Sequence, residues 1–166
     1  MSWGFGREEE LAREIGVLLR QRRLCLAVAE SCTGGLLGNL ITNVPGSSDY
    51  FRGGVIAYSN AVKEQVLSVK PETLADYGAV REEAAREMAE GIRRLLGTDL
   101  ALAVTGIAGP GGGSPQKPVG LTYIALAAEG YSLCLRFQWG GGRWEDKVAS
   151  AGAALEMLKE YLAGLE

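Results

Sequence analysis

The segment Leu24-Cys-Leu-Ala-Val-Ala-Glu-Ser-Cys-Thr-Gly-Gly35 joins a short apolar run to a polar junction that ends in two glycines. Leu24–Ala29 has the length and continuous apolarity of a strand that is buried on both faces. The residues that follow, Gly34–Val44, predict a helix that Pro45 ends. A buried strand that turns directly into a helix is typical of an α/β fold with parallel strands.

Working outward, the same two kinds of element fill the chain. Apolar residues at helical spacing, or a proline at a first turn, predict further helices: Arg7–Arg23, Val62–Val69, a short helix from Pro71, Glu82–Leu96 and Arg143–Gly164. Further strands are expected at Gly54–Tyr58 and Leu100–Thr105, followed by a hairpin of Val119–Ala128 and Ser132–Gln138. In the helix Glu82–Leu96 we expect Met88, Ile92, Leu95 and Leu96 to share the buried face. The order predicts a three-layer α/β/α sandwich with a mixed central sheet.

Composition bounds the class of protein. The 166 residues suit one domain, 1–166, and 47% hydrophobic with 22% charged residues is typical of a globular protein. A net charge of -3 argues against a nucleic-acid partner, which a basic face would indicate. No apolar run has the length of a membrane span, and Met1–Glu10 is too acidic for a signal peptide, so no membrane is expected. Three scattered cysteines, an odd count, favour a reducing cytoplasm.

The chain has no histidine. This absence excludes Ser-His-Asp and Cys-His nucleophiles, histidine metal ligands and histidine acid–base catalysis. Three separated cysteines without a C-x-x-C pair also argue against a structural zinc site, so we expect neither a metal nor a cofactor. Proton transfer in an enzyme of this composition must fall to lysine, tyrosine, cysteine or carboxylates.

The strand-to-helix junction is the first candidate site. Ser31, and alternatively Cys32, would lie at a helix N-terminus, where unpaired N–H groups can stabilise an oxyanion. Thr33, Gly34 and Gly35 would let a substrate approach the backbone closely. The simpler alternative is that Ser31 or Thr33 caps the helix and the glycines only form its turn.

The second candidate joins Tyr58 and Lys63 at the end of the next strand. Without histidine, a serine nucleophile needs another base, and a Ser-Lys pair is a recognised variant. The pKa of a free lysine is about 10.4 and that of a useful base is about 7–8, so Lys63 must be partly buried or lie beside a cation. Tyr58 would hold the lysine or relay a proton. The alternative is an ordinary surface lysine.

The third candidate is the loop Thr105–Pro118, whose glycines and prolines suit a backbone cradle for an anion. It matches neither a Walker A loop nor the G-x-G-x-x-G fingerprint, and a rigid surface connection is the alternative. Lys117 and Arg143 would supply positive charge for a phosphate. The candidate binding residues are Thr105, Gly106, Gly109, Gly111, Gly112, Lys117 and Arg143.

The motifs occur together in a recognisable order. They are Glu30-Ser-Cys-Thr-Gly-Gly35, Val44-Pro-Gly-Ser-Ser48, Tyr58-Ser-Asn60 with Lys63, Gly78-Ala-Val80, Thr105-Gly-Ile-Ala-Gly-Pro-Gly-Gly-Gly-Ser114 and Lys117-Pro-Val-Gly120. In this order the sequence resembles the C-terminal domain family of the competence/damage-inducible CinA proteins, which includes the stand-alone nicotinamide-nucleotide amidohydrolase PncC. The resemblance extends from the first helix to the last.

The resemblance implies an α/β/α fold, a homodimer, and hydrolysis of nicotinamide mononucleotide to nicotinic acid mononucleotide and ammonia. Ser31 would be the catalytic serine and Lys63 its basic partner. Tyr58 and Thr105 would support them, and the loop Gly109–Gly113 would line the nucleotide pocket. The chemistry of the pyrophosphatase-like domain of full-length CinA proteins is not expected here.

The chain departs from the family at the start of its last helix. Arg143 is kept, but Gly142 stands where the family has aspartate and Lys147 where it has a second arginine, and Gln116 replaces a frequent glutamate. Lysine lacks the bidentate fork of arginine, so these changes bear on phosphate binding. They motivate an alternative function, a nucleotide-binding or regulatory module without turnover.

Overall fold

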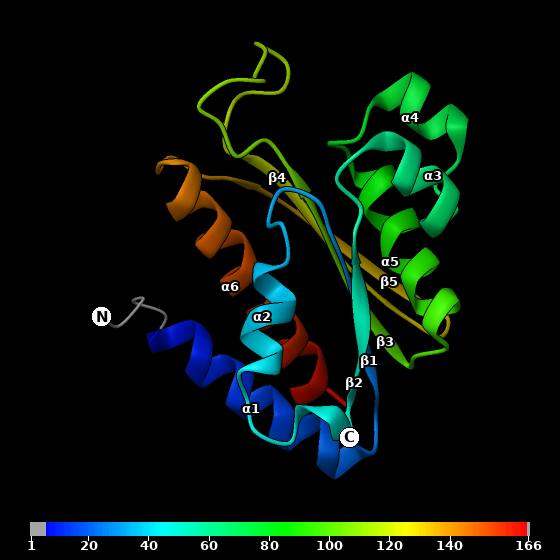
Figure 1. The fold of residues 1–166 in the computed structure, drawn as a ribbon, viewed down its shortest axis with the longest axis vertical. Helices are drawn as coiled ribbons and strands as arrows, with labels where there is room; N and C mark the ends of the chain where they lie inside the picture. The colour runs from blue at the N-terminus through cyan, green and yellow to red at the C-terminus, as the bar shows by residue number, and fades with distance from the viewer. Residues whose placement is uncertain (1–5, 166) are drawn as a thin grey trace.

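The computed structural model describes residues 6–165 and arranges them as helices around one sheet (Figure 1). The helices are α1 (Gly6–Arg22), α2 (Leu36–Thr42), α3 (Asn60–Leu67), α4 (Pro71–Tyr77), α5 (Glu82–Leu96) and α6 (Arg143–Ala163), with a 3-10 turn η1 (Ser47–Asp49). The strands are β1 (Leu26–Glu30), β2 (Phe51–Ile56), β3 (Leu100–Gly106), β4 (Leu121–Ala128) and β5 (Tyr131–Gln138). Residues 1–5 of the acidic N-terminal segment, and residue 166, lie outside the described part.

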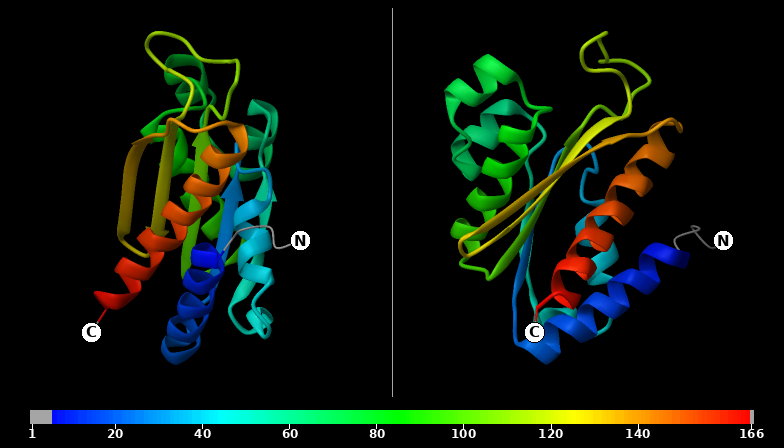
Figure 2. Two further views of the ribbon diagram at one scale, coloured as in Figure 1. Left: turned by 90° about the vertical axis from the view of Figure 1, so that its left-hand side faces the viewer. Right: turned by 180° about the vertical axis from the view of Figure 1, so that it is seen from behind.

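The sheet has the strand order β2-β1-β3-β4-β5. β1 pairs in parallel with both β2 and β3, whereas β4 is antiparallel to β3 and to β5. α1, α2 and α6 cover one face and α3, α4 and α5 the other, as the two views in Figure 2 show. The predicted three-layer α/β/α sandwich with a mixed sheet is therefore confirmed. No helix within residues 6–165 is both long and apolar enough to cross a membrane.

The two faces of the sheet carry side chains of different size because strand residues alternate in direction. Large residues such as Leu26, Val28 and Leu102 face α1, α2 and α6. Alanines face α5 instead, namely Ala27, Ala29, Ala101, Ala103, Ala125 and Ala127. This flat alanine face lets α5 pack closely on the sheet through Met88 and Ile92.

Several predicted boundaries move for local reasons. α2 begins at Leu36, not at Gly34, because Gly34 and Gly35 adopt positive φ angles of 61° and 102°. β4 begins at Leu121, after Gly120 with φ 90°. The prediction that Leu95 and Leu96 face the core is wrong, since they are 52% and 37% exposed. They lie in the last turn of α5, where a Cβ at Gly53 would lie 3.8 Å from Leu96 Cδ1.

Candidate active site

Five segments far apart in the sequence meet where the parallel strands end. They are the carboxyl ends of β1 and β3, the connection from β2 to α3, the connection from α4 to α5, and the first turn of α6. A cavity of about 200 Å³ lies between them. The predicted site residues Ser31, Tyr58, Lys63, Thr105, Gly106 and Arg143 all line this cavity, together with Cys32, Asn60, Ala79, Val80 and Ala108.

Ser31 and Lys63 are in direct contact at the bottom of this arrangement. The Lys63 ammonium donates hydrogen bonds to Ser31 Oγ at 3.0 Å, to the Ala57 carbonyl at 2.7 Å and to the Tyr58 carbonyl at 3.2 Å. Lys63 is 1% exposed, so its amine is shielded from water. Desolvation by this burial lowers the pKa of Lys63 from its ordinary value.

This geometry fits a neutral amine as well as an ammonium. A neutral amine keeps two N–H groups and one lone pair. The two carbonyls of Ala57 and Tyr58 can accept the two N–H groups. The lone pair then faces Ser31 Oγ and can accept the hydroxyl proton. Lys63 can therefore act as a base toward Ser31 without moving.

Local sequence explains why a lysine is buried here. Ser59 caps α3, since its hydroxyl accepts the Val62 N–H at 3.3 Å. The helix therefore starts at Asn60, and its inward face carries Lys63 and, one turn later, Leu67. Lys63 lies in the first turn, beside the end of β2, and its stem reaches back to the last residues before the helix.

Tyr58 contributes its backbone and its side chain to different contacts. Its carbonyl accepts from Lys63, while its phenol oxygen accepts from Arg143 Nη2 at 3.3 Å. The Tyr58 side chain is largely exposed at the mouth of the cavity. Of the two roles predicted for Tyr58, holding the lysine is thus supplied by its backbone, and no contact joins its phenol to Lys63.

Arg143, the first residue of α6, links the cavity to the glycine-rich loop. Its Nη1 donates to the Gly109 carbonyl at 2.7 Å while Nη2 reaches Tyr58. Its side chain remains exposed. Lys117 lies elsewhere, because its ammonium donates to the Tyr77 carbonyl at the end of α4. The loop is therefore held at both ends by cations, but Gly109, Gly111, Gly112 and Lys117 do not line the cavity.

Sequence reasoning gave no role to Glu30, which is 2% exposed and fixes the turn that carries Ser31. Its carboxylate accepts the N–H groups of Leu37 at 2.9 Å and Gly38 at 3.0 Å, in the first turn of α2. An acidic residue directly before a predicted helix was the available signal, because carboxylates stabilise helix N-termini.

Thr33, Gly34 and Gly35 form the turn between Ser31 and α2 but do not line the cavity. The Gly34 N–H is bonded to the Ser31 carbonyl at 3.1 Å. The structure gives the N–H groups of Thr33 and Gly35 no acceptor within residues 6–165. The Lys147 ammonium lies next to Gly34, at 3.5 Å from the position a Cβ would take there. Positive charge therefore lies beside the turn.

Thr105 and Gly106 shape the cavity wall from the end of β3. The Thr105 hydroxyl donates to the Ala79 carbonyl at 2.8 Å, which ties the segment after α4 to the sheet. A Cβ at Gly106 would lie 2.6 Å from Thr122 Oγ1 and 3.1 Å from Cys32 Sγ. Only glycine fits this position without displacing its neighbours.

Cys32 is the alternative nucleophile, and it also lines the cavity. Burial raises the pKa of its thiol to about 11. The thiol is therefore protonated at neutral pH. Ser31, with an adjacent base, is the better-placed nucleophile.

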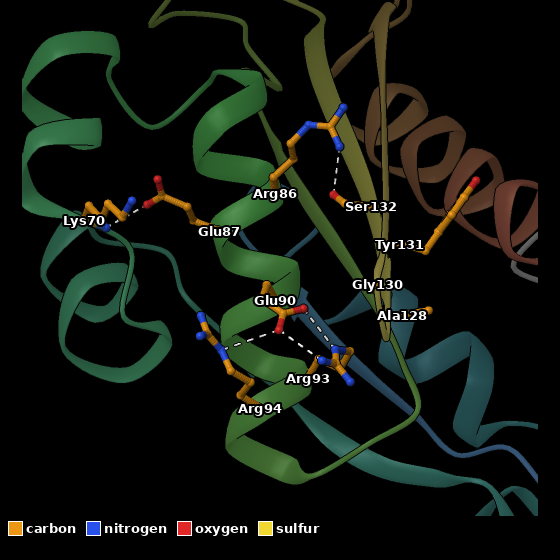
Figure 3. Close-up of a pocket in the computed structure, with 10 residues that line it drawn as sticks. All are labelled: Lys70, Arg86, Glu87, Glu90, Arg93, Arg94, Ala128, Gly130, Tyr131 and Ser132. Carbon is orange, nitrogen blue, oxygen red and sulfur yellow. Dashed lines mark hydrogen bonds and ion pairs between the residues drawn. The ribbon is translucent and has the colours of Figure 1, made fainter.

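A larger cavity of about 590 Å³ lies between α5 and the start of β5 (Figure 3). Its arginines are already engaged: Arg93 and Arg94 pair with Glu90, and Arg86 pairs with Glu82 and donates to Ser132 Oγ at 2.8 Å. It holds no nucleophile next to a base. Within residues 6–165, no group of three or more Cys, Asp or Glu side chains is placed to hold a metal ion.

The fold and the buried serine–lysine pair define an α/β/α domain with a small cavity at the carboxyl ends of its parallel strands. The family model of the CinA C-terminal domain matches residues 8–162, and the chain belongs to this family. It is 47% identical over 163 residues to a CinA-like protein of Thermotoga maritima, covering 98% of this chain and 40% of that protein. A putative competence-damage inducible protein of Desulforudis audaxviator is 49% identical over 155 residues, 93% of this chain and 38% of that protein.

Solved structures agree with this assignment. The competence/damage inducible protein CihA of Agrobacterium tumefaciens superposes with a TM-score of 0.94 at 42% identity, covering 98% of this chain and 99% of that one. The competence damage-inducible protein A of Klebsiella pneumoniae gives a TM-score of 0.93 at 35% identity, covering 96% and 99%. The chain spans about two fifths of the length of the curated relatives it matches.

Proposed function

We propose that the protein is an amidohydrolase that converts nicotinamide mononucleotide to nicotinic acid mononucleotide and ammonia. The observation that carries the proposal is the 3.0 Å contact of Ser31 Oγ with the buried amine of Lys63. A buried amine of lowered pKa beside a hydroxyl is the arrangement that activates a serine when histidine is absent. The substrate and the reaction come from the family resemblance.

The proposed reaction begins with Lys63 as a neutral amine. It takes the proton of Ser31 Oγ while the oxygen attacks the carboxamide carbon, giving a tetrahedral oxyanion. As the C–N bond breaks, the Lys63 ammonium returns the proton to the leaving nitrogen, and ammonia departs. Water then attacks the acyl ester while Lys63 accepts its proton. The Lys63 ammonium returns that proton to Ser31 Oγ as the ester C–O bond breaks, which restores the hydroxyl and the neutral amine. Direct attack by water, activated by the same residues, is the close alternative.

Backbone N–H groups would stabilise the oxyanion. Those of Thr33 and Gly35 are the candidates. These residues do not line the cavity, but they belong to the turn that follows its lining residues Ser31 and Cys32, and the structure gives their N–H groups no acceptor within residues 6–165. The Lys147 ammonium beside Gly34 would add positive charge to the same turn. The cavity is smaller than the roughly 300–1,000 Å³ of drug-sized sites, so it would hold the carboxamide ring, with the ribose and phosphate outside toward Arg143.

The wider setting is also a proposal. We infer a single domain over residues 1–166 that acts in the cytoplasm as a homodimer, without metal or cofactor. The three free cysteines support a reducing compartment. The homodimer follows from the family resemblance.

The test is ammonia release from nicotinamide mononucleotide in the presence of EDTA. Ser31→Ala and Lys63→Met should each lower kcat by at least about 10³-fold, because each removes one member of a unit. Ser47→Ala and Lys70→Met are matched controls, a buried serine and an exposed lysine outside the cavity, and should keep activity.

Two results would overturn the assignment. Full activity of Ser31→Ala would exclude the serine nucleophile. Tight binding of nicotinamide mononucleotide by the wild-type protein, measured calorimetrically, with no ammonia formed would favour the nucleotide-binding or regulatory module instead. The specific observation behind that alternative is the chain's departure at Gly142 and Lys147, next to the cavity residue Arg143.

A further inference from the structure

Asn60 lines the candidate active-site cavity, but the proposed reaction gives it no role. The other lining side chains that carry oxygen or nitrogen already form hydrogen bonds within the protein; they are Ser31, Tyr58, Lys63, Thr105 and Arg143. The side-chain amide of Asn60 forms none within residues 6–165. Its acceptor oxygen and its N–H donors are therefore available to a bound molecule.

Helix geometry places Asn60 beside the reactive pair. Asn60 is the first residue of α3 and Lys63 lies three positions later, so the two side chains share one face of the helix. Side chains on a helix lean toward its N-terminus, which brings the Lys63 amine back toward the start of α3. Lys63 is buried, whereas Asn60 is exposed. Asn60 therefore lies on the α3 wall of the cavity, outward of the Lys63 amine.

A carboxamide makes opposite demands at its two ends. Its carbonyl oxygen becomes the oxyanion and needs hydrogen-bond donors, whereas its nitrogen carries two N–H groups and needs acceptors. In the proposed reaction this nitrogen leaves as ammonia after it takes a proton from the Lys63 ammonium, so Lys63 is then a donor to it. Another group must accept an N–H of the substrate and keep the nitrogen near Lys63.

We propose that the side-chain oxygen of Asn60 accepts an N–H of the substrate carboxamide, holds the leaving nitrogen near Lys63, and so selects amides over esters of the same acid. An ester has no N–H to donate at this position, so only an amide gains the hydrogen bond. The inference rests on the proposed function, because it takes the carboxamide as the reacting group. Asn60 is then a substrate-binding residue that determines specificity.

Asparagine provides this acceptor without adding negative charge. A carboxylate at the same position would stabilise the Lys63 ammonium and raise the pKa of the amine, which would reduce the neutral form needed as a base. Within residues 6–165 no ion pair involves Lys63, and burial lowers its pKa. A neutral acceptor keeps the amine in that state while it binds the substrate nitrogen.

Thr105 Oγ1 is a competing neutral acceptor in the lining, and its position favours a different role. Its hydroxyl donates to the Ala79 carbonyl at 2.8 Å, which holds the segment before α5 against the end of β3. Asn60 shares a helix face with Lys63, whereas Thr105 belongs to β3. Because the leaving nitrogen must lie within reach of the Lys63 amine, Asn60 is the acceptor that we assign to it.

The experiment compares two substrates derived from one acid, nicotinamide mononucleotide and the methyl ester of nicotinic acid mononucleotide. Asn60→Ala should lower kcat/KM for the amide by about 3–10-fold, which is the loss of one neutral hydrogen bond, and should leave the ester unaffected. Asn39→Ala is the matched control, an exposed asparagine of α2 outside the cavity lining, and should change neither value. An unchanged ratio of amide to ester activity in Asn60→Ala would overturn the proposal.

Asn60→Asp separates the hydrogen bond from a merely structural contribution. The carboxylate restores an acceptor oxygen, so the ratio of amide to ester activity should return toward the wild-type value. Its negative charge should also shift the pH–rate profiles of both substrates to higher pH, because it stabilises the Lys63 ammonium. Equal losses with both substrates in Asn60→Ala and Asn60→Asp, with no shift of either profile, would mean that Asn60 only supports the fold, and the proposal would be wrong.

Binding measurements separate this inference from the proposed reaction. In a Ser31→Ala background, which removes the proposed nucleophile, Asn60→Ala should raise the calorimetric dissociation constant of nicotinamide mononucleotide by about 3–10-fold. If the wild-type protein releases no ammonia but this loss of affinity is seen, the reaction is wrong and the Asn60 contact stands. If ammonia is released and neither the affinity nor the amide-to-ester ratio depends on Asn60, the reaction stands and the inference is wrong. Absence of both binding and turnover would overturn both.

Discussion

At Lys63, burial and hydrogen bonding act on the same amine in opposite directions. Three acceptors surround it at 2.7–3.2 Å and favour the ammonium, whereas removal from water disfavours the charge. Burial is the dominant influence, and the pKa is lowered. The competition matters because only the neutral amine has a lone pair for the Ser31 proton.

The lowered pKa of Lys63 predicts how activity depends on pH. The reactive neutral form increases as pH rises through this pKa, so kcat/KM should rise with pH to a plateau, with a midpoint below the ordinary lysine value of 10.5. Lys63→Arg should lose at least about 10³-fold at every pH, because a guanidinium does not deprotonate. The measurement is a pH–rate profile of ammonia release, with Lys70→Arg as the control.

Stability gives an independent check on the same amine. Since the pKa is lower in the folded than in the unfolded chain, the unfolded chain binds more protons between the two values, and Lys63 makes the free energy of unfolding increase with pH across that alkaline window. Lys63→Met should lack this increase in denaturant titrations. The titration of Cys32, with its raised pKa, acts oppositely but is common to both proteins. Identical pH dependence of the two proteins would contradict a lowered pKa of Lys63.

At the same scale, the sequence could supply the residue types of the site but not their contacts. The absence of histidine points to a lysine base, and Ser31 and Lys63 do meet although they lie 32 positions apart. The sequence could not predict the contacts of Tyr58, because either its carbonyl or its phenol oxygen can accept a hydrogen bond from Lys63. Lys117 was expected near a phosphate from its charge alone, yet a free carbonyl at the end of α4 holds its ammonium.

At the scale of the element, α2 depends on a carboxylate that belongs to the preceding strand. Glu30 satisfies two N–H groups at the start of the helix, where the N-cap residue Gly35 has no side chain to do so. The strand end, the turn with Ser31 and the helix are thereby fixed relative to one another. Glu30 is a positioning residue for Ser31.

Glu30→Gln is expected to destabilise the protein by about 1–3 kcal/mol, because the amide group cannot accept both N–H bonds and leaves a buried donor unpaired. The melting temperature should fall by roughly 3–10 °C. Because the same turn carries Ser31, kcat should fall more than KM rises. Glu160→Gln, at an exposed position of α6, should change neither quantity. An unchanged melting temperature for Glu30→Gln would mean that α2 does not need this carboxylate.

Helices and strands with strong periodicity were predictable, whereas their ends depended on backbone conformations. The buried strand β3 and the long helix α5 follow from apolar runs and helical spacing. The start of α2 could not be predicted in this way, because Gly34 and Gly35 could either continue the helix or precede it, depending on their φ angles. Leu95 and Leu96 keep the helical spacing, but they lie in the last turn of α5 and are 52% and 37% exposed.

At the scale of the whole molecule, Arg143 is the residue that joins the layers around the cavity. It is the first residue of α6. Its guanidinium donates to the Gly109 carbonyl in the loop after β3 and to the Tyr58 phenol oxygen in the segment after β2. The cavity lining contains two basic residues, Lys63 and Arg143. Lys63 is buried, so the exposed guanidinium of Arg143 is the positive charge at the mouth of the cavity. Arg143 can therefore have one of two roles. It can hold the loop and Tyr58 in place, or it can bind the phosphate of the proposed substrate.

Kinetics with two substrates separate these roles. If Arg143 binds the phosphate, Arg143→Met should raise KM for nicotinamide mononucleotide by about 10–100-fold, which is the loss of a charge-assisted hydrogen bond of roughly 1.5–3 kcal/mol. Hydrolysis of nicotinamide riboside, which lacks the phosphate, should change little. Arg94→Met on the exposed side of α5 is the matched control. Equal loss with both substrates would instead assign Arg143 to holding Tyr58 and the Gly109 loop, because misplacement of the cavity walls affects the carboxamide of either substrate.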